Sequence, residues 1–399
     1  MAARGYLWWT TMRSAELFAG CGGLALGMSR AGFRPELMAE WDSDAVATVL
    51  HNKKRKIEHV RAWPMVQQDV RAIDWAPFAN ALVNLSGGPP CQPFGIGGKK
   101  AGDADARDMW PEAIRGVREA RPESFLFENV RNLAGPKFAP YLNWIIENLR
   151  RPDEQQRPRE SREAHLARLQ RSTKAPSYQV VCQVVNAADY GAPQIRNRVI
   201  IMGVQAVFAA ALMPMRPTHS RDRLLWEQWV SGAYWRRHGM KPPKKGLEKR
   251  DAVVVARLKK LGNAPAELPW ITLRDAIAGL GDPNGRCNHI FRDGARIYSG
   301  HTGSPLDMPS KALKAGDHGV PGGENMIRFP NGSVRYLTAR EAARLVGLPD
   351  DYDFPRSWTE SMRQMGNAVP TQLAEAAGRH LRSALEKGWS SRASSMAAE

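Results

Sequence analysis

A cysteine in a tight turn, Cys91, is the side chain of this sequence most suited to nucleophilic chemistry. It lies in the octapeptide GGPPCQPF (87–94), after the apolar stretch FANALVNLSG (78–87), which predicts a buried strand. Glycines and prolines end a strand and impose a sharp turn, and open α/β sheets build their active sites at the carboxyl ends of parallel strands. The glycine-rich loop GIGGKKAG (95–102) follows. We therefore predict a catalytic nucleophile here, rather than a buried structural cysteine, the commoner role of a free thiol.

A second group of residues fits the binding of a nucleotide-like cofactor. The stretch AELFAGCGGLALGM (15–28) reads as a strand, a glycine turn and a helix, which lets a ligand approach the backbone and the free N–H groups of a helix N-terminus. Glu40 comes 20 residues after Gly20, the spacing of an acid that accepts hydrogen bonds from ribose hydroxyls. The alternative for Glu40 is a solvated loop acid. We expect Trp41 to cover an adenine face and Asp69 to contact the adenine amine.

Polar side chains also follow two later strands. The stretch SFLFENV (124–130) reads as a strand that ends in Glu128 and Asn129. A carboxyl group there can serve in acid–base chemistry, and the alternative is a cap for the next helix. In the later motif QIRNR, Arg196 and Arg198 alternate with other residues, so they project from one face of an extended strand. Two arginines on one face can clamp a phosphate or hold a polar substrate.

Positive charge is in excess and unevenly distributed. The chain carries a formal net charge of +17, and residues 205–300 hold 17 lysines and arginines against 8 acidic residues. Basic residues are interleaved there with tryptophans and tyrosines. That composition suits phosphate contacts and stacking, although the aromatic residues could equally form a small core. We therefore expect a nucleic-acid partner rather than a merely basic surface.

The remaining composition excludes several classes of protein. The four cysteines, Cys21, Cys91, Cys182 and Cys287, lie far apart with no CxxC pair. This argues against a disulfide framework and a metal site, and it fits a reducing cytoplasm. No apolar run reaches the length of about 18 residues that a membrane span needs. With 399 residues, 43% of them hydrophobic, the chain can build about two domains.

Two helical segments can be placed from the sequence. Thr338, with Glu341 three residues later, forms a capping box, which predicts the start of a helix that buries Leu345. Residues 150–175 are charged and poor in apolar residues. They predict a solvated helix or a flexible insertion without a catalytic role.

Taken in order, these motifs resemble those of the bacterial DNA (cytosine-5) methyltransferases, and the resemblance covers most of the chain. FAGCGG is similar to the cofactor-binding first motif of that family, GGPPCQPF to the catalytic fourth and ENV to the sixth. QIRNR, RYLTAREAARLVGLP and QMGNAVP are similar to the eighth, ninth and tenth. Two departures are visible, because Glu16 stands where an aspartate is common and Gly95 where a serine is common.

The resemblance implies an α/β fold, a Rossmann-like methyltransferase sheet that depends on S-adenosylmethionine, with a smaller, irregular target-recognition domain. Residues 1–205, completed by 351–399, would form the catalytic domain, and residues 206–350 the target-recognition domain. Double-stranded DNA would lie in the cleft between them. The implied protein is a cytoplasmic, nucleoid-associated monomer without a metal. It would act beside a restriction endonuclease in a restriction-modification system, or alone in an epigenetic role.

The resemblance also implies a role for individual residues. Those expected to bind S-adenosylmethionine are Phe18, Gly20, Gly22, Glu40, Trp41, Asp69, Pro89, Asn367 and Ala368, with Trp110 as a further candidate. Those expected to act in catalysis are Cys91, Gln92, Glu128, Asn129 and Arg196. Those expected to contact DNA are Lys99, Lys100, Arg198, Arg236, Arg237, Lys244 and Lys245.

In the implied reaction, Cys91 attacks C6 of a cytosine flipped out of the duplex, and C5 then becomes nucleophilic enough to take the methyl group. Glu128 contacts N3 and the exocyclic amine, while Arg196 orients the base and this carboxylate. Loss of the C5 proton and elimination of the cysteine release 5-methylcytosine. One alternative is a tRNA cytosine methyltransferase, which usually carries a Cys-Phe-Thr motif that this sequence lacks. The other is a non-catalytic DNA-binding regulator, against which the intact catalytic motifs count.

Overall fold

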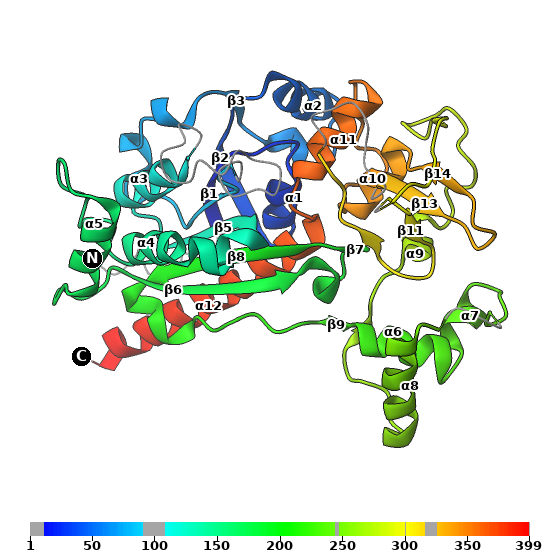
Figure 1. Ribbon diagram of the computed structural model, residues 1–399. Helices are drawn as coiled ribbons and strands as arrows, with labels where there is room; N and C mark the ends of the chain where they lie inside the picture. The colour runs from blue at the N-terminus through cyan, green and yellow to red at the C-terminus, as the bar shows by residue number, and fades with distance from the viewer. Residues whose placement is uncertain (1–11, 91–107, 244–246, 300, 316–324, 399) are drawn as a thin grey trace.

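The structure, a computed structural model, describes residues 12–90, 108–243, 247–299, 301–315 and 325–398. Its centre is a seven-stranded sheet in the order β3-β2-β1-β4-β5-β8-β6 (Figure 1). The first five strands of the chain pair in parallel, whereas β8 is antiparallel to β5 and β6. The strands are β1 (Met12–Leu17), β2 (Phe33–Glu40), β3 (Met65–Gln67), β4 (Asn84–Gly87), β5 (Ser124–Val130), β6 (Tyr178–Asn186) and β8 (Asn197–Gln205).

The strand order reverses between β1 and β4. From β1 the chain runs outward through β2 and β3 on one side, and from β4 through β5 on the other. Such a reversal leaves a crevice outside the carboxyl ends of the strands, where open α/β sheets bind their ligands. The strand expected over 78–87 is shorter than predicted. Phe78 ends the 3-10 helix η3 (Ala76–Phe78), a turn follows, and only the last four residues pair in β4.

Helices cover both faces of the sheet. On one face α1 (Gly23–Arg30) packs beside the long C-terminal helix α12 (Thr371–Ala398), drawn in red in Figure 1. On the other face lie α3 (Trp110–Ala120) and α4 (Ala139–Arg150). In β5, Phe125 and Phe127 enter the core under α3 and α4, while Leu126 enters the core under α12. This alternation is the two-residue period of a strand buried on both faces.

The second lobe follows β8 and is built from short elements. Helices α6 (Arg221–Trp229), α7 (Ala233–Arg237) and α8 (Lys249–Leu261) form a unit set apart from the sheet (Figure 1). Nearer the sheet lie α9 (Leu273–Ile277), β11 (Ser304–Pro305), β13 (Met326–Arg328) and β14 (Val334–Tyr336). The pair β9 (His219–Ser220) and β10 (Leu268–Pro269) brackets the helical unit. The expected domain boundary falls at η8 (Ala206–Ala211), whose Phe208 still packs in the core beneath α12.

Two helices connect the second lobe to helix α2 beside the sheet. The capping box predicted at Thr338 is confirmed. Its hydroxyl accepts the Glu341 N–H at 3.2 Å, and the Glu341 carboxylate accepts the Thr338 N–H at 2.9 Å. The helix that follows, α10 (Ala339–Leu345), packs with α11 (Trp358–Asn367) and with α2 (Ser43–Lys54) around one core.

The charged segment 150–175 contains a helix, α5 (Arg162–Gln170), that is not solvated throughout. His165 and Leu169 are fully buried, and His165 accepts the indole N–H of Trp144 on α4, whereas Ala164 and Ala167 are exposed. The segment therefore contains the expected helix, but this helix is solvated on one side only. Among the described residues, no helix is long and apolar enough to cross a lipid bilayer.

Candidate active site

The glycine turn between β1 and α1 faces the crevice. Gly20 and Gly22 have φ angles of 54° and 84°, a left-handed conformation that favours glycine. A Cβ atom on Gly22 would lie 2.4 Å from the ring of Trp63, so only glycine fits there. A Cβ atom on Gly20 would meet no described residue within 4 Å. The backbone at Gly20 is therefore open to a ligand.

The segment QMGNAVP (364–370) lies directly against the glycine turn FAGCGG (18–23). A Cβ atom on Gly23, the first residue of α1, would come within 2.4 Å of the Val369 carbonyl oxygen. Ala368 is buried in this contact, while Asn367 is exposed. Gly366 and Asn367 are the last two residues of α11, and a bend follows at Ala368.

The carboxylate of Glu40 accepts hydrogen bonds from the glycine turn and from the residues after β2. One oxygen accepts the Gly20 N–H at 2.8 Å, and the other accepts the N–H groups of Trp41 and Asp42 at 2.9 and 2.8 Å. Three backbone donors thus fix one negative charge at the end of β2. Trp41 beside it is 71% exposed, so its ring face is open for stacking.

Asp69 also lies near the end of a strand, but its carboxylate is already paired. It forms a bidentate ion pair with Arg71, with Nη2 and Oδ2 at 2.5 Å. The hydrogen bonds and charge of Arg71 lower the pKa of Asp69. The group is therefore an ionised acceptor at neutral pH, and an adenine amine would share it with Arg71.

Two other expected cofactor residues differ in exposure. Phe18, with a φ of 55°, is half-buried at the end of β1. Trp110 is fully buried, edge-on to Phe127 with ring centroids 5.8 Å apart, so it belongs to the core. The described part of the chain contains no group of three or more side chains that could hold a metal ion.

The ends of β4 and β5 bring the expected catalytic segments together. The side-chain amide of Asn129 donates to the Pro89 carbonyl at 3.0 Å. A Cβ atom on Gly88 would lie 3.5 Å from Oε2 of Glu128, so the turn passes close to this carboxylate. The turn after β4 is thus fixed against the end of β5. Outside the described residues lie Cys91, Gln92, Lys99 and Lys100.

Glu128, only 8% exposed, is paired with Arg198, whose Nε lies 2.5 Å from Oε1. We expected Arg196 to orient this carboxylate and Arg198 to contact DNA. The structure instead places the contact to the carboxylate at Arg198. Arg196 lies in the break between β7 (Gln194–Ile195) and β8, and its guanidinium donates to the carbonyls of Leu313 and Gly366 at 3.2 and 2.6 Å.

The first half of the QIRNR motif therefore joins the two lobes. The amide of Gln194 donates to the Leu345 carbonyl at 2.8 Å, and it is fully buried. The short strand β7 pairs with β12 (Ser310–Lys311). Together with Arg196, these contacts fasten second-lobe residues to the edge of the catalytic sheet.

Glu16, near the end of β1, is a buried carboxyl group for which the sequence predicted no role. Glu16 is 2% exposed, and the Ser86 hydroxyl donates to its Oε2 at 3.3 Å. Its Oε1 has no hydrogen-bond partner within the described residues. Burial raises the pKa of Glu16 to about 8, so the group keeps its proton at neutral pH. Only the replacement of the usual aspartate had pointed to this position.

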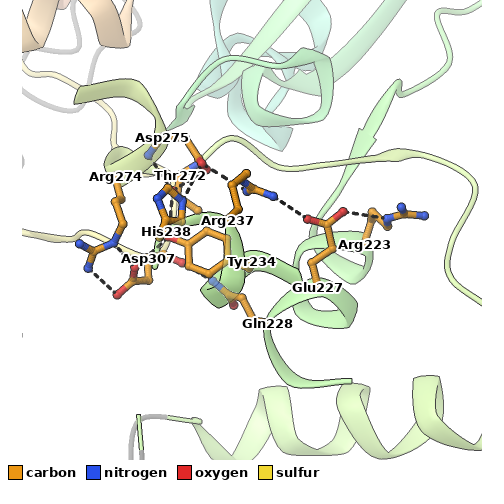
Figure 2. Close-up of polar contacts among 10 residues, drawn as sticks. All are labelled: Arg223, Glu227, Gln228, Tyr234, Arg237, His238, Thr272, Arg274, Asp275 and Asp307. Carbon is orange, nitrogen blue, oxygen red and sulfur yellow. Dashed lines mark hydrogen bonds and ion pairs between the residues drawn. The ribbon is translucent and has the colours of Figure 1, made fainter. Parts of the chain in front are cut away.

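Arg237, an expected DNA contact, lies in a polar network of the second lobe (Figure 2). Its guanidinium pairs with Glu227 at 3.1 Å and with Asp275 at 3.2 Å, and it lies over the Tyr234 ring at 5.3 Å. The network ties α6 and α7 to α9, so this arginine fastens elements of its own lobe. Of the other expected contacts, Arg236 is exposed, and Lys244 and Lys245 lie outside the described residues.

The same network reaches the chain beyond α9. The Tyr234 hydroxyl donates to Asp307 at 2.8 Å, and Arg274 pairs with the same carboxylate at 2.6 Å (Figure 2). Burial raises the pKa of Tyr234, which keeps its hydroxyl a donor over the physiological pH range. The helical unit is therefore held to the rest of its lobe by charged and hydroxyl groups.

Known proteins are similar to this chain in sequence. A profile of the family described as C-5 cytosine-specific DNA methylase matches residues 12–153, 160–224 and 291–383. The Type II methyltransferase M.NgoMIV of Neisseria gonorrhoeae is 29% identical over 94% of this chain and 98% of its own length. The Type II methyltransferase M.Eco47II of Escherichia coli is 30% identical over 93% of this chain and 79% of its own length.

Solved structures agree on the fold. A putative DNA modification methyltransferase from an E. coli prophage superimposes with a TM-score of 0.51 at 23% identity, covering 94% of this chain and 100% of its own. The S. pombe Dnmt2 methyltransferase gives 0.52 at 15% identity, with 94% and 99% covered. Family and fold thus confirm the expected α/β methyltransferase. The chain belongs to the C-5 cytosine-specific DNA methylase family and is a DNA cytosine-5 methyltransferase.

Proposed function

We propose that this protein uses S-adenosylmethionine to methylate C5 of a flipped cytosine in a short sequence of double-stranded DNA, through a covalent adduct between Cys91 and C6. The main support is the placement of two fixed carboxylates at the carboxyl ends of the parallel strands. Glu40 closes the open glycine turn on one side, and Glu128 is held by Arg198 on the other. A cofactor and a base bound beside these groups would meet in one crevice.

The residues around the glycine turn fit a nucleoside cofactor. The open backbone at Gly20 leaves room for it, and the fixed charge of Glu40 suits ribose hydroxyls. The exposed ring of Trp41 suits an adenine face. When S-adenosylmethionine is bound there, it supplies an activated methyl group. The protein's part is to hold the donor still beside the cytosine.

Cytosine C5 is a poor nucleophile until a group adds at C6. The thiolate of Cys91 would form a bond to C6 and break the C5=C6 double bond, which moves electron density to C5. Once C5 carries the methyl group, loss of the C5 proton and departure of the thiolate restore the double bond. Pro89, two residues before the cysteine, is fastened by Asn129. The chain therefore enters the catalytic turn from a fixed point next to Glu128.

Glu128 is the group placed to recognise the cytosine. Its carboxylate can accept the exocyclic amine, and a proton shared with N3 would stabilise the negative charge that forms on addition of the thiolate. Arg198 holds the carboxylate by a charge-assisted hydrogen bond. Because the neighbouring Gly88 has no side chain, no Cβ atom at this position of the turn packs against Oε2 of this carboxylate.

The second lobe and its excess charge support duplex DNA as the substrate. The cytosine must leave the stack to reach a buried carboxylate. On α8, the exposed Lys249, Arg250, Lys259 and Lys260 form no ion pair with another described residue. We assign them to phosphate contacts. Since the curated relatives are named Type II methyltransferases, we place the enzyme, as a monomer, beside a restriction endonuclease of the same target sequence.

The test is to incubate the purified protein with S-adenosylmethionine and unmethylated DNA and to map 5-methylcytosine at base resolution. We expect methylation confined to one short sequence, which would also reveal the specificity. Cys91→Ser should abolish methylation and retain DNA binding. Binding of the cofactor without any methylation of DNA would refute the proposal and point to an RNA substrate.

A further inference from the structure

We propose that Arg363, on helix α11, is a positioning residue for the carboxylate of Glu40. The inference rests on the proposed function, because Glu40 is the acid assigned to the ribose hydroxyls of S-adenosylmethionine. Arg363 belongs to none of the motifs expected to bind the cofactor, and it lies directly before the segment QMGNAVP. Its effect reaches Glu40 through Asp42.

Asp42 links the arginine to the acid of the cofactor site. Its N–H donates to Oε1 of Glu40 at 2.8 Å, so the backbone of Asp42 helps to fix that carboxylate. Its own carboxylate has two partners. Oδ1 accepts the Ala45 N–H at 2.8 Å and caps α2, while Oδ2 lies 2.8 Å from Nη2 of Arg363. A movement of Asp42 would therefore alter a hydrogen bond to Glu40.

Arg363 is oriented by a second carboxylate, on its own helix. Its Nε and Nη2 donate to Oε2 and Oε1 of Glu360, each at 2.7 Å. This bidentate contact uses the planar fork that distinguishes arginine from lysine. The side chains of Arg363, Glu360 and Asp42 are 29%, 18% and 32% exposed, so all three are partly withdrawn from water. The cation thus has one defined position between two acids.

Helix α11 gives this arginine a fixed base. Met362 and Met365, on either side of it in the chain, are buried in the core shared with α10 and α2. The Cys21 thiol donates to the Gln364 carbonyl at 3.7 Å, which joins the helix to the glycine turn. Because the helix is held in this way, Arg363 can fix Asp42 relative to the glycine turn.

The alternative is an ion pair that only joins α11 to α2. The chain offers a comparison, because Arg356 pairs with Asp44 at 2.8 Å between the residues before α11 and the first turn of α2. The donors to the Glu40 carboxylate given above are the N–H groups of Gly20, Trp41 and Asp42. Loss of the Arg356 pair should therefore loosen the same two parts of the chain without disturbing Glu40.

The test compares Arg363→Met with Arg356→Met in the full-length protein. Titration calorimetry measures the affinity for S-adenosylmethionine, at a temperature where circular dichroism shows both variants folded. We expect Arg363→Met to weaken binding about tenfold, as on loss of one charged hydrogen bond to a ligand. Single-turnover methyl transfer at saturating cofactor should stay within about twofold.

Two further results decide the outcome of this comparison. Arg363→Lys should recover part of the affinity, because it keeps the charge but not the fork. Arg356→Met should bind the cofactor as the parent does. An unchanged affinity in Arg363→Met, or an equal loss in Arg356→Met, would overturn the proposal.

Asp42→Asn tests whether the arginine acts through Asp42. Asparagine keeps an oxygen that can cap α2 but loses the charge that pairs with Arg363. Asp42→Asn and its combination with Arg363→Met should both bind the cofactor about as weakly as Arg363→Met alone. Losses that add in the double variant would overturn the route through Asp42. The single variant also carries the test if Arg363→Met fails to fold.

Hydrogen exchange separates this inference from the proposed function, because it needs no cofactor. The N–H groups of Trp41 and Asp42 both donate to Oε1 of Glu40. Their exchange, followed by mass spectrometry, should be about threefold or more faster in Arg363→Met and unchanged in Arg356→Met. Equal exchange in the parent and both variants would overturn the role of Arg363. A parent that does not bind S-adenosylmethionine, with faster exchange in Arg363→Met, would refute only the proposed function.

Discussion

Nε of Arg198 lies 2.5 Å from Oε1 of Glu128, and the two side chains are only 14% and 10% exposed. The residues come from neighbouring antiparallel strands, with Arg198 opposite Val130, two residues beyond the glutamate. The arginine therefore reaches diagonally across the strand pair to the carboxylate. A mostly buried charge pair of this kind is sensitive to loss of either partner, and it has a defined geometry that a substrate can use.

Arg198→Lys should therefore impair catalysis more than folding. Lysine keeps the charge but lacks the planar group that fixes the carboxylate. We expect the single-turnover rate of methyl transfer to fall about 10- to 100-fold, with a small change in the free energy of unfolding. Arg379→Lys on the exposed face of α12 is the matched control and should behave as the parent does. A parental rate in Arg198→Lys would show that the pair has no catalytic importance.

Substitution of Arg196 should lower the stability of the fold more than it lowers the rate of catalysis. Its guanidinium serves the carbonyls of Leu313 and Gly366, which lie in the second lobe and at the end of α11. Arg196→Met leaves these buried acceptors without their donor, so we expect the free energy of unfolding to fall by about 2–5 kcal/mol. Denaturant unfolding measures this directly. A loss of rate as large as that of Arg198→Lys, without a loss of stability, would contradict this assignment.

Glu16 should make stability depend on pH. Burial raises the pKa of Glu16 to about 8, against 4.5 for the ordinary group. Between these values the unfolded chain loses the proton that the folded protein keeps, so folding stability falls as the pH rises through this window. The slope is at most about 1.4 kcal/mol per pH unit. Glu16→Gln removes this dependence.

The stability advantage of Glu16→Gln over the parent should accordingly grow from pH 5.5 to pH 8. Urea unfolding at the two pH values measures it. Glu58→Gln, at an exposed position, should show no such growth. An equal difference between Glu16→Gln and the parent at both pH values would mean that the group is already ionised in the folded state.

The cations of α8 should contribute to the salt dependence of DNA binding. Neutralising Lys249, Arg250, Lys259 and Lys260 together to glutamine should reduce the slope of log K against log salt by about two to four. The slope is obtained from binding isotherms at several salt concentrations. Neutralising Arg379 and Arg382 on α12 provides a comparison on the far helix. The proposed phosphate contacts would be wrong if the slope stayed the same.

Much of the fold follows from local signals that tertiary contacts do not override. The capping box at Thr338 and the glycine turn after β1 are fixed by short-range hydrogen bonding and by backbone conformation, and both were predictable. The length of β4 was not, because the end of η3 and the turn after it take residues 78–83 of the apolar stretch. The burial of α5 was missed as well, because two buried residues, His165 and Leu169, were enough to anchor a charged helix.

The candidate site, too, could be predicted only in part from the sequence. Alternation in QIRNR places Arg196 and Arg198 on one side of an extended chain, but it does not say which arginine reaches Glu128. That depends on the break between β7 and β8, which turns Arg196 toward α11. Likewise, the sequence predicts that Arg237 is a cation free to contact DNA. In the structure it pairs with Glu227 on α6 and Asp275 on α9. The spacing of residues in the sequence does not reveal pairings between elements that lie far apart along the chain.

The covalent role of Cys91 is tested most directly by trapping the adduct. The target sequence found by mapping is synthesised as a duplex with 5-fluorocytosine at the methylated position. Fluorine cannot leave as the C5 proton does, so elimination of the thiolate is blocked. With S-adenosylmethionine present, we predict a protein–DNA complex that survives denaturing electrophoresis and is absent in Cys91→Ala. A parent enzyme that methylates the normal duplex but forms no such complex, or a complex that persists in Cys91→Ala, would contradict the account.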